Sequence, residues 1–230
     1  MPRTPRSSRI CNRRILRDAL IAFALIAWCG AFAAGSSLVK PGLAESLLAG
    51  IAKTPPVSTS FVQVSYRGVL DRPLVVSGTL QWLGGDRMQR DIDKPFKETA
   101  KIGEGELSVQ RGSGDVHRMP LARAPQAGAM LAGFRALLGG DVSALQQDFT
   151  LSAQGGSAHW VITLAPRTTQ LKRQLVSIVI DGRAHEPRCL TVTDANGDSS
   201  ITLVGAMAEA GLRSTAPLAS ALAARCRNSQ

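Results

Sequence analysis

Residues 127–140 read AGAMLAGFRALLGG, a stretch that has helical spacing but hardly any polar face. Arg135 is its one charged residue. A surface helix of a soluble protein normally has one apolar stripe and one polar face. This helix is therefore predicted to be covered over most of its circumference. Because it interrupts a series of strand-like segments, the sequence on either side of it decides the fold.

The sequence before this helix alternates between apolar and polar residues with period two. In residues 74–83, for example, Val76, Leu80 and Trp82 fall on one face of the expected strand. Strands at regular spacing, separated by Gly-rich or Pro-containing links, are typical of an antiparallel sheet or barrel. The elements expected here are a helix over residues 43–53 and strands over 60–67, 74–83, 87–93, 97–102, 106–110 and 116–121.

Strands are expected to resume after the helical segment. Asp141 is predicted to cap a second helix, and residues 194–198 (DANGD) predict a hairpin turn because Asn-Gly tolerates positive φ. With these segments, the sequence predicts about eleven antiparallel strands in all. The elements expected here are helices over 142–149 and 168–175 and strands over 150–153, 158–165, 176–181, 188–193 and 199–207.

The N-terminus combines six arginines within residues 1–17 with an apolar run over residues 19–34 that ends in small residues. This order is typical of a secretory signal peptide. The alternative is a membrane anchor, but the run of about 16 residues is shorter than the roughly 20 that a spanning helix needs. We expect a signal peptide over residues 1–33 that directs export, a folded domain over 34–210 and a tail of uncertain order over 211–230.

Much of the positive charge belongs to this leader. It takes six of the 27 Lys and Arg and one of the 17 Asp and Glu, which leaves 21 against 16, a net charge of +5. Outside the leader the chain has two Trp, four Phe and one Tyr, too few for a platform on which bases stack. We therefore expect no nucleic-acid partner.

The sequence contains no recognisable metal or catalytic motif. None of the three histidines has a second His or a Cys at metal-ligand spacing. Residues 194–198 imitate the start of an EF-hand loop, yet Ser199 and Gly205 stand where Gly and Glu are required. Asp91 and Asp93 share a strand face and are expected to be solvated. We expect a monomer that is not an enzyme and that holds no metal or cofactor.

Cys189 and Cys226 are the two cysteines outside the leader. An exported protein meets an oxidising compartment, so a disulfide that ties the C-terminal tail to a strand is one interpretation. The other is a small core residue at Cys189 and a separate thiol in the tail. The sequence leaves both open.

A series of short motifs gives a family resemblance. The motifs are Phe61-x-Gln63, Gly78-x-Leu80, Met88 to Pro95-Phe96, Gly140-Asp141 with Leu145 and Phe149, and Trp160-x-x-x-Leu164-x-Pro166. Taken together, behind a signal peptide, their order over roughly residues 40–207 resembles the LolA-like family of periplasmic outer-membrane lipoprotein carriers, and the later ones look like a divergent branch. The resemblance implies a location in the periplasm of a Gram-negative cell.

The resemblance implies a mainly β fold, a half-open antiparallel barrel of about eleven strands closed by a helical lid. Its hydrophobic cavity takes the acyl chains of a lipoprotein or related lipid, received from an inner-membrane donor and passed to an outer-membrane acceptor. Helical spacing places five residues of the 127–140 segment on the inner side of the lid. The expected cavity and lid residues are Phe61, Leu80, Trp82, Met88, Arg90, Ile102, Met130, Leu131, Phe134, Leu137, Leu138 and Trp160.

Two positions depart from the family pattern. Gly84-Gly85 replaces the usual Arg-Pro before the third strand, and Arg90 replaces an aromatic residue within it. Inside a cavity, Arg90 is expected either to meet an anionic group on the ligand or to lie at the mouth, because an unpaired buried guanidinium is costly.

Four alternatives to a lipoprotein carrier remain. In the first, the helix only caps a core filled by side chains. In the second, the barrel is an interaction or sensor module, and in the third, the cargo is a different lipid or a pigment-like molecule. In the fourth, the protein is an enzyme that acts on a bound lipid through Arg90 with Asp91 or Asp93.

Overall fold

The computed structural model describes residues 42–134, 142–212, 214 and 217–228. The expected signal peptide over residues 1–33 thus lies outside the described residues. In chain order the elements are α1 (Leu43–Ile51), β1 (Val57–Tyr66), β2 (Leu74–Gly84), β3 (Arg87–Lys94), β4 (Glu98–Gly103), β5 (Glu106–Arg111), β6 (Val116–Pro120), η1 (Leu121–Arg123), α2 (Pro125–Phe134), α3 (Val142–Asp148), β7 (Phe149–Gly156), β8 (His159–Pro166), α4 (Thr169–Lys172), β9 (Leu175–Arg183), β10 (Glu186–Asp194), β11 (Ser199–Val204), α5 (Ala206–Glu209) and α6 (Ala219–Asn228).

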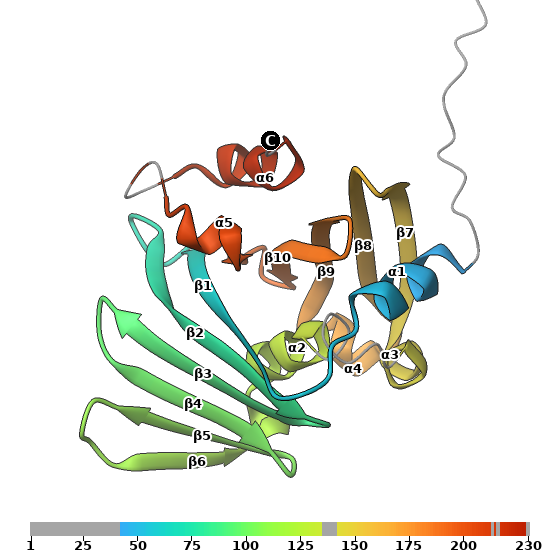
Figure 1. Cartoon of the computed structure of the whole chain (residues 1–230). Coiled ribbons are helices and arrows are strands. Elements are labelled where there is room, and N and C mark those ends of the chain that lie inside the picture. Colours follow the sequence, from blue (N-terminus) through green and yellow to red (C-terminus); the bar gives the residue numbers. More distant parts are fainter. Residues whose placement is uncertain (1–41, 135–141, 213, 215–216, 229–230) are drawn as a thin grey trace, which may run out of the picture. The chain divides into compact units, whose positions relative to one another are not determined.

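All eleven of these strands belong to one antiparallel sheet, in the order β6-β5-β4-β3-β2-β1-β11-β10-β9-β8-β7. The first strand pairs with the last, which joins an N-terminal half-sheet to a C-terminal one (Figure 1). β6 and β7 end the sheet, so it is not closed. This confirms the predicted mainly β fold, a half-open antiparallel sheet of about eleven strands.

The inner face of the sheet carries the main hydrophobic core, because residues two apart in a strand share a face. Phe61, Leu80 and Met88, from three neighbouring strands, are at most 2% exposed. In the C-terminal half, the indole of Trp160 lies over Gly182 of the paired strand and donates from Nε1 to the Ala184 carbonyl at 2.8 Å. Any Cβ at position 182 would overlap that ring, so only glycine fits there.

Helices α1, α2 and α3 pack against this inner core. Leu48 of α1, Leu131 of α2 and Leu145 of α3 are each buried in it. The α2 backbone approaches β10 closely at Gly133, where a Cβ would lie 3.2 Å from Leu190 Cδ1. Helices α2 and α3 thus lie on the inner side of the sheet. No helix among the described segments is long and apolar enough to span a membrane.

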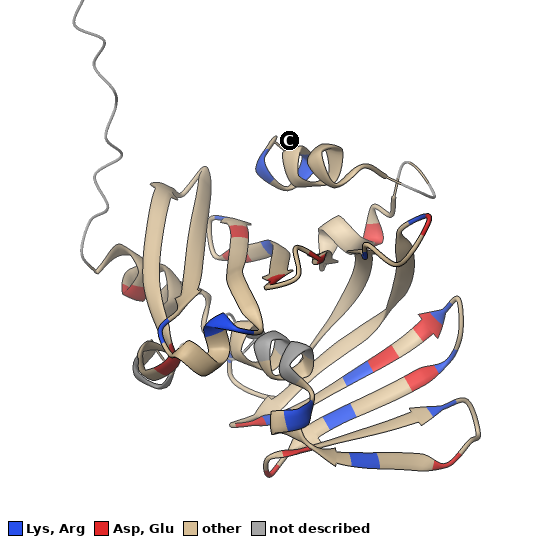
Figure 2. Ribbon diagram, turned by 180° about the vertical axis from the view of Figure 1, so that it is seen from behind, with Lys and Arg blue, Asp and Glu red and all other residues tan. Residues whose placement is uncertain are grey.

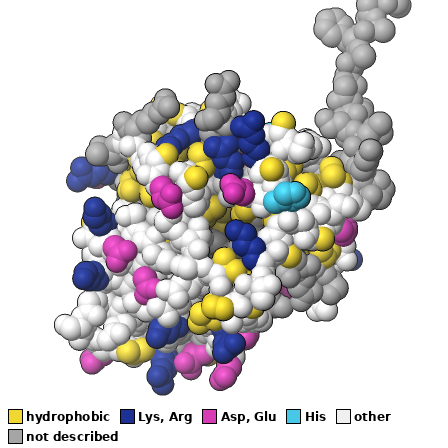
Figure 3. All heavy atoms as spheres, viewed as in Figure 1, with side chains coloured by type: hydrophobic (Ala, Val, Ile, Leu, Met, Phe, Trp, Pro, Cys, Tyr) yellow, Lys and Arg dark blue, Asp and Glu magenta, His cyan; other side chains and the backbone are white. Residues whose placement is uncertain are grey.

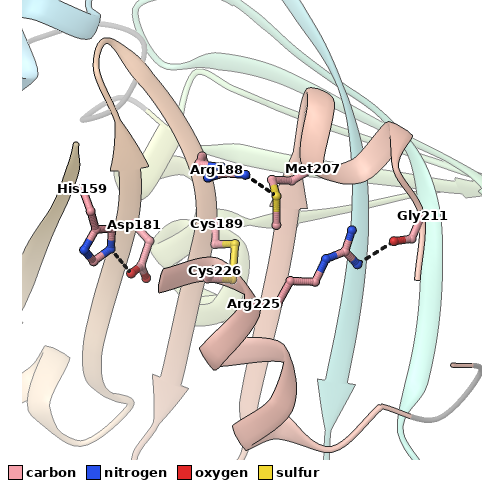
Figure 4. Close-up of a disulfide and its surroundings, with 8 residues drawn as sticks. All are labelled: His159, Asp181, Arg188, Cys189, Met207, Gly211, Arg225 and Cys226. Carbon is pink, nitrogen blue, oxygen red and sulfur yellow. Dashed lines mark hydrogen bonds and ion pairs between the residues drawn. A yellow bond between two sulfur atoms is a disulfide. The ribbon is translucent and has the colours of Figure 1, made fainter. Parts of the chain in front are cut away.

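A second, smaller core lies on the outer face, where α5 and α6 cover β1, β10 and β11. Val64, Leu203 and Leu222 are buried there. Cys189 of β10 and Cys226 of α6 form a disulfide in this cluster (Figure 4). The structure therefore selects one of the two interpretations that the sequence left open for the cysteines, and the C-terminal helix is tied to the sheet.

The structure corrects the extent of several predicted elements, and two of the corrections have a clear physical reason. The strand expected over residues 199–207 ends at Val204, since Gly205 takes a φ of 54° and begins the short helix α5. The helix expected over 168–175 is one turn, Thr169–Lys172, capped by the Thr168 side chain, and Leu175 already belongs to β9. In both places the apolar residues keep their spacing while the backbone changes from strand to helix or from helix to strand. The spacing alone therefore does not show where the element ends.

Charged residues concentrate on β3 to β6 and on the turns (Figure 2), whereas the sequences of β7 and β8 contain no Lys, Arg, Asp or Glu. On the face shown in Figure 3, basic and acidic side chains lie among hydrophobic ones and do not gather into a patch of one sign.

Candidate functional site

A cavity of about 220 Å³ lies against the inner face of the sheet and reaches α2 at Ala127. It is lined by strands of both half-sheets, β1 and β3 to β5 on one side and β10 and β11 on the other. Much of its wall is apolar. The apolar lining residues are Met88, Ala100, Ile102, Leu107, Val109, Ala127, Leu190 and Val192.

The strand register explains this wall. Met88 of β3 pairs with Ile102 of β4, which pairs with Leu107 of β5, so three apolar side chains form a row across the strands. In the next row, Ala100 lies between Arg90 and Val109. The small side chain of Ala100 leaves space in the middle of the sheet that a larger residue would fill.

Arg90 lies on the inner face in the middle of this wall. Its Cζ is 4.9 Å from the centroid of the Phe61 ring, within the range of a cation–π interaction. One Nη donates to Gln63 Oε1 at 3.2 Å, while Nε is buried and has no hydrogen-bond partner among the described residues. Burial lowers the pKa of Arg90 below its usual value, an effect that the negative charge of Glu98 opposes.

The other end of the cavity is polar. Arg67 forms ion pairs with Asp194 at 3.1 Å and Asp198 at 3.4 Å. Asp194 Oδ1 also accepts from the backbone N–H groups of Asn196 and Asp198 at 2.9 and 3.0 Å. These contacts hold the β10–β11 hairpin, so the residues that imitate an EF-hand serve the turn. The cavity therefore runs from a paired, polar end to an apolar one, with Arg90 between them.

Three of the twelve predicted site residues, Met88, Arg90 and Ile102, line this cavity. Five others are buried in the surrounding core and do not line it: Phe61, Leu80, Trp82, Leu131 and Trp160. Leu137 and Leu138, and the side chains of Met130 and Phe134, lie outside the described part of the chain, so their roles stay predictions.

Sequence reasoning missed several lining residues, among them Ala100, Val109, Leu190 and Ala127. Period-two alternation places Ala100 and Val109 on the inner face once Arg90 is placed there, but alanine carries little hydrophobic signal. Ala127 lies one helical turn before Leu131 and shares its face, which identifies the side of α2 that meets the cavity.

The enzyme hypothesis requires Arg90 and an aspartate to act on the same bound lipid, and the position of Asp91 does not fit this requirement. Asp91 Oδ1 accepts from Thr99 Oγ1 at 2.7 Å, and its Oδ2 accepts from Gln89 Nε2 at 2.8 Å, on the face opposite Arg90. Arg90 and Asp91 therefore do not face a common ligand. Within the described segments, no group of three or more His, Cys, Asp or Glu is arranged to hold a metal ion.

Gly84-Gly85, the departure from the family's Arg-Pro, lies at the tight turn between β2 and β3. Gly84 has a φ of 100° and Gly85 a φ of 57°, in the left-handed region that glycine favours. The Gly85 carbonyl accepts from Trp82 Nε1 at 3.1 Å. This pair of glycines therefore shapes the turn.

Comparison with known proteins places the chain in a family. A family model described as outer membrane lipoprotein carrier protein LolA-like matches residues 39–229, well over half of the chain. A search of curated proteins found no match.

Solved structures with a related arrangement are distant. A LolA superfamily protein from Nitrosomonas europaea has 10% identity and a TM-score of 0.40, covering 70% of this chain and 91% of that one. A DUF1329 family protein from Desulfovibrio piger has 12% identity and a TM-score of 0.37, covering 71% and 90%. A chain from the CwlD amidase–GerS lipoprotein complex of Clostridioides difficile has 16% identity and a TM-score of 0.32, covering 61% and 78%. The family assignment rests on the family model.

Proposed function

The chain belongs to the LolA-like family of outer membrane lipoprotein carriers, and from this premise we propose that it binds the acyl chains of a lipoprotein or related lipid and ferries them across the periplasm. The family is one of carriers, not of enzymes. The cargo is proposed to enter the cavity between the two half-sheets and α2. An inner-membrane donor and an outer-membrane acceptor complete the proposed route.

The observation that carries this proposal is the cavity, which has an apolar region of wall inside a sheet that is not closed. Moving hydrocarbon from water into such a space contributes about 0.8 kcal/mol for each buried CH₂ group, with no chemistry needed. Release then requires only that the space opens to a partner or a membrane.

The size of the cavity indicates how loading works. At about 220 Å³ it is smaller than the roughly 300–1,000 Å³ typical of ligand pockets. A whole acyl chain therefore enters only when the wall moves. We propose that α2 is the part of the wall that moves, because it reaches the cavity at Ala127 and packs on β10 at Gly133 without strand pairing.

Two features support a periplasmic location. The leader-like sequence of residues 1–33 directs export, and the Cys189–Cys226 disulfide suits an oxidising compartment.

The proposal is tested by filling the cavity. Ala100→Trp places an indole between Arg90 and Val109, and we expect it to reduce uptake of a fluorescent acyl probe at least tenfold. Lys101→Trp is the matched control, because Lys101 is the next residue of β4 and points to the exposed face. Equal uptake by the wild type, Ala100→Trp and Lys101→Trp proteins would place the ligand elsewhere and remove the support for a carrier.

A further inference from the structure

Resting on the proposed carrier function, we propose that the cargo is an amphiphile with one oxyanion, a carboxylate or a phosphate, and that Arg90 binds this group inside the cavity. The hydrocarbon of the cargo then lies along the row formed by Met88, Ile102 and Leu107.

The first support is the unused hydrogen-bonding capacity of Arg90. A guanidinium has five N–H donors, and the one side-chain acceptor that contacts Arg90 among the described residues is Gln63, at 3.2 Å. Nε is buried without a partner. Nε–H and the adjacent Nη–H form the edge that binds a carboxylate or phosphate with two parallel hydrogen bonds.

The second support is that no carboxylate among the described residues forms an ion pair with Arg90. Glu98 contributes a negative charge to the surroundings of Arg90, but its Oε2 accepts from Arg111 Nε at 2.7 Å. Arg67, on the same cavity, contrasts with Arg90 because two aspartates lie within 3.4 Å of it. Arg67 is thus paired with two carboxylates of the protein, whereas Arg90 is available to form an ion pair with an anionic ligand.

The third support is the cost of this arrangement. A buried charge without a partner is unfavourable, and the neighbours of Arg90 within β3 on the inner face, Met88 and Ile92, are 2% and 4% exposed. A purely hydrophobic cargo gains nothing from a cation at this place. A bound oxyanion supplies the missing acceptor and offsets the desolvation of the guanidinium.

The position of Arg90 also orients the cargo. The apolar row begins two residues before it, at Met88, while the polar end of the cavity lies toward Gln63, Ser200 and Thr202. When an anionic head group binds Arg90, the hydrocarbon chain of the cargo therefore extends toward the apolar end of the cavity, beneath Ala127 of α2.

The test compares three ligands that share a twelve-carbon chain: laurate, dodecyl phosphate and dodecanol. For each ligand, the affinity is measured from its displacement of the neutral dye Nile red. The protein is the exported form obtained by expressing the full-length chain, and each ligand is kept below its critical micelle concentration. We expect at least one anionic ligand to bind about tenfold or more tightly than dodecanol, the ratio expected of a charge-assisted pair. Which anion binds more tightly identifies the head group.

Arg90→Met should remove this preference while dodecanol affinity stays within about threefold of the wild type. Arg87→Met is the matched control, an exposed arginine on the opposite face of the same strand, and should keep the preference. Arg90→Gln repeats the test should the methionine variant not fold.

The outcomes separate the two claims. Equal affinity for anionic and neutral ligands, or a preference that survives Arg90→Met and Arg90→Gln, overturns the role of Arg90 and leaves the carrier standing. Failure of all three ligands to displace the dye overturns the carrier function itself.

Discussion

Arg90 of β3 lies over the ring of Phe61 of β1, with its guanidinium carbon 4.9 Å from the ring centroid, although β2 separates the two strands in the sheet. The contact spans β2 because Phe61 pairs with Gly78, a residue without a side chain. A cation thus reaches into the inner core of the half-open sheet, and this relationship distinguishes the cavity from one that is apolar throughout.

Without ligand, the Arg90→Met variant should be as stable as the wild type or more stable. Arg90 is half-buried with its Nε fully buried, and replacing desolvated charged groups with apolar side chains of similar volume is often neutral or stabilising. The free energy of unfolding in urea measures this. A loss of more than about 2 kcal/mol would show that the contacts of Arg90 with Phe61 and Gln63 outweigh its desolvation.

The disulfide should stabilise the protein by constraining the unfolded chain. Its cysteines are 37 residues apart, and a cross-link of this kind typically contributes about 2–4 kcal/mol. The double variant Cys189→Ala/Cys226→Ala should therefore unfold at lower urea concentration, and a reducing agent should lower the midpoint of the wild type similarly. The reducing agent should not affect the double variant. Equal midpoints for all samples would contradict a stabilising cross-link.

Gly182→Ala should destabilise the core severely, by about 3 kcal/mol, the upper end of the usual range for overpacking. The added methyl overlaps the Trp160 ring, which is fully buried and cannot move without losing its hydrogen bond to Ala184. Gly156→Ala is the matched control, since a Cβ there meets no atom within 4 Å. Thermal melting of both variants measures the difference, and similar melting temperatures would argue against this close contact.

Gly133→Leu should push α2 away from β10. Even a Cβ at this position lies 3.2 Å from Leu190 Cδ1, so a leucine leaves no room for the present packing. We expect faster uptake of a hydrophobic dye in stopped-flow measurements, together with lower stability. Gly128→Leu, on the same helix, has no Cβ contact closer than 4.0 Å and should change uptake little. Slower or unchanged uptake by Gly133→Leu would mean that α2 is not the moving wall.

Alternation and turn chemistry predicted most of the sheet. The family resemblance named Met88, Arg90 and Ile102 as cavity residues and the structure places them in the cavity lining, while the predicted Asn196-Gly197 turn is present with Gly197 at a φ of 84°. The predicted end of the last strand, at residue 207, was wrong. A residue such as Met207 satisfies the apolar pattern equally well on a strand face or on helix α5.

The chemistry of the site was only partly predictable. The family resemblance made Arg90 a candidate cavity residue, but its contacts with Phe61 and Gln63 depend on the pairing of β1, β2 and β3. Leu190 reaches the same cavity only because β1 pairs with β11, which closes the distance between the two halves of the chain. Such long-range pairing leaves no local pattern in the sequence.

The central claim is that this protein carries an acyl-bearing molecule. The most direct test is mass spectrometry of the organic extract of the protein, purified from the periplasm without detergent after expression of the full-length chain. The account predicts an acylated amphiphile in stoichiometric amount, depleted in the Ala100→Trp variant and retained in Lys101→Trp. An extract with no bound lipid, together with no uptake of hydrophobic dye, would contradict the carrier function and favour an interaction module built on the same sheet.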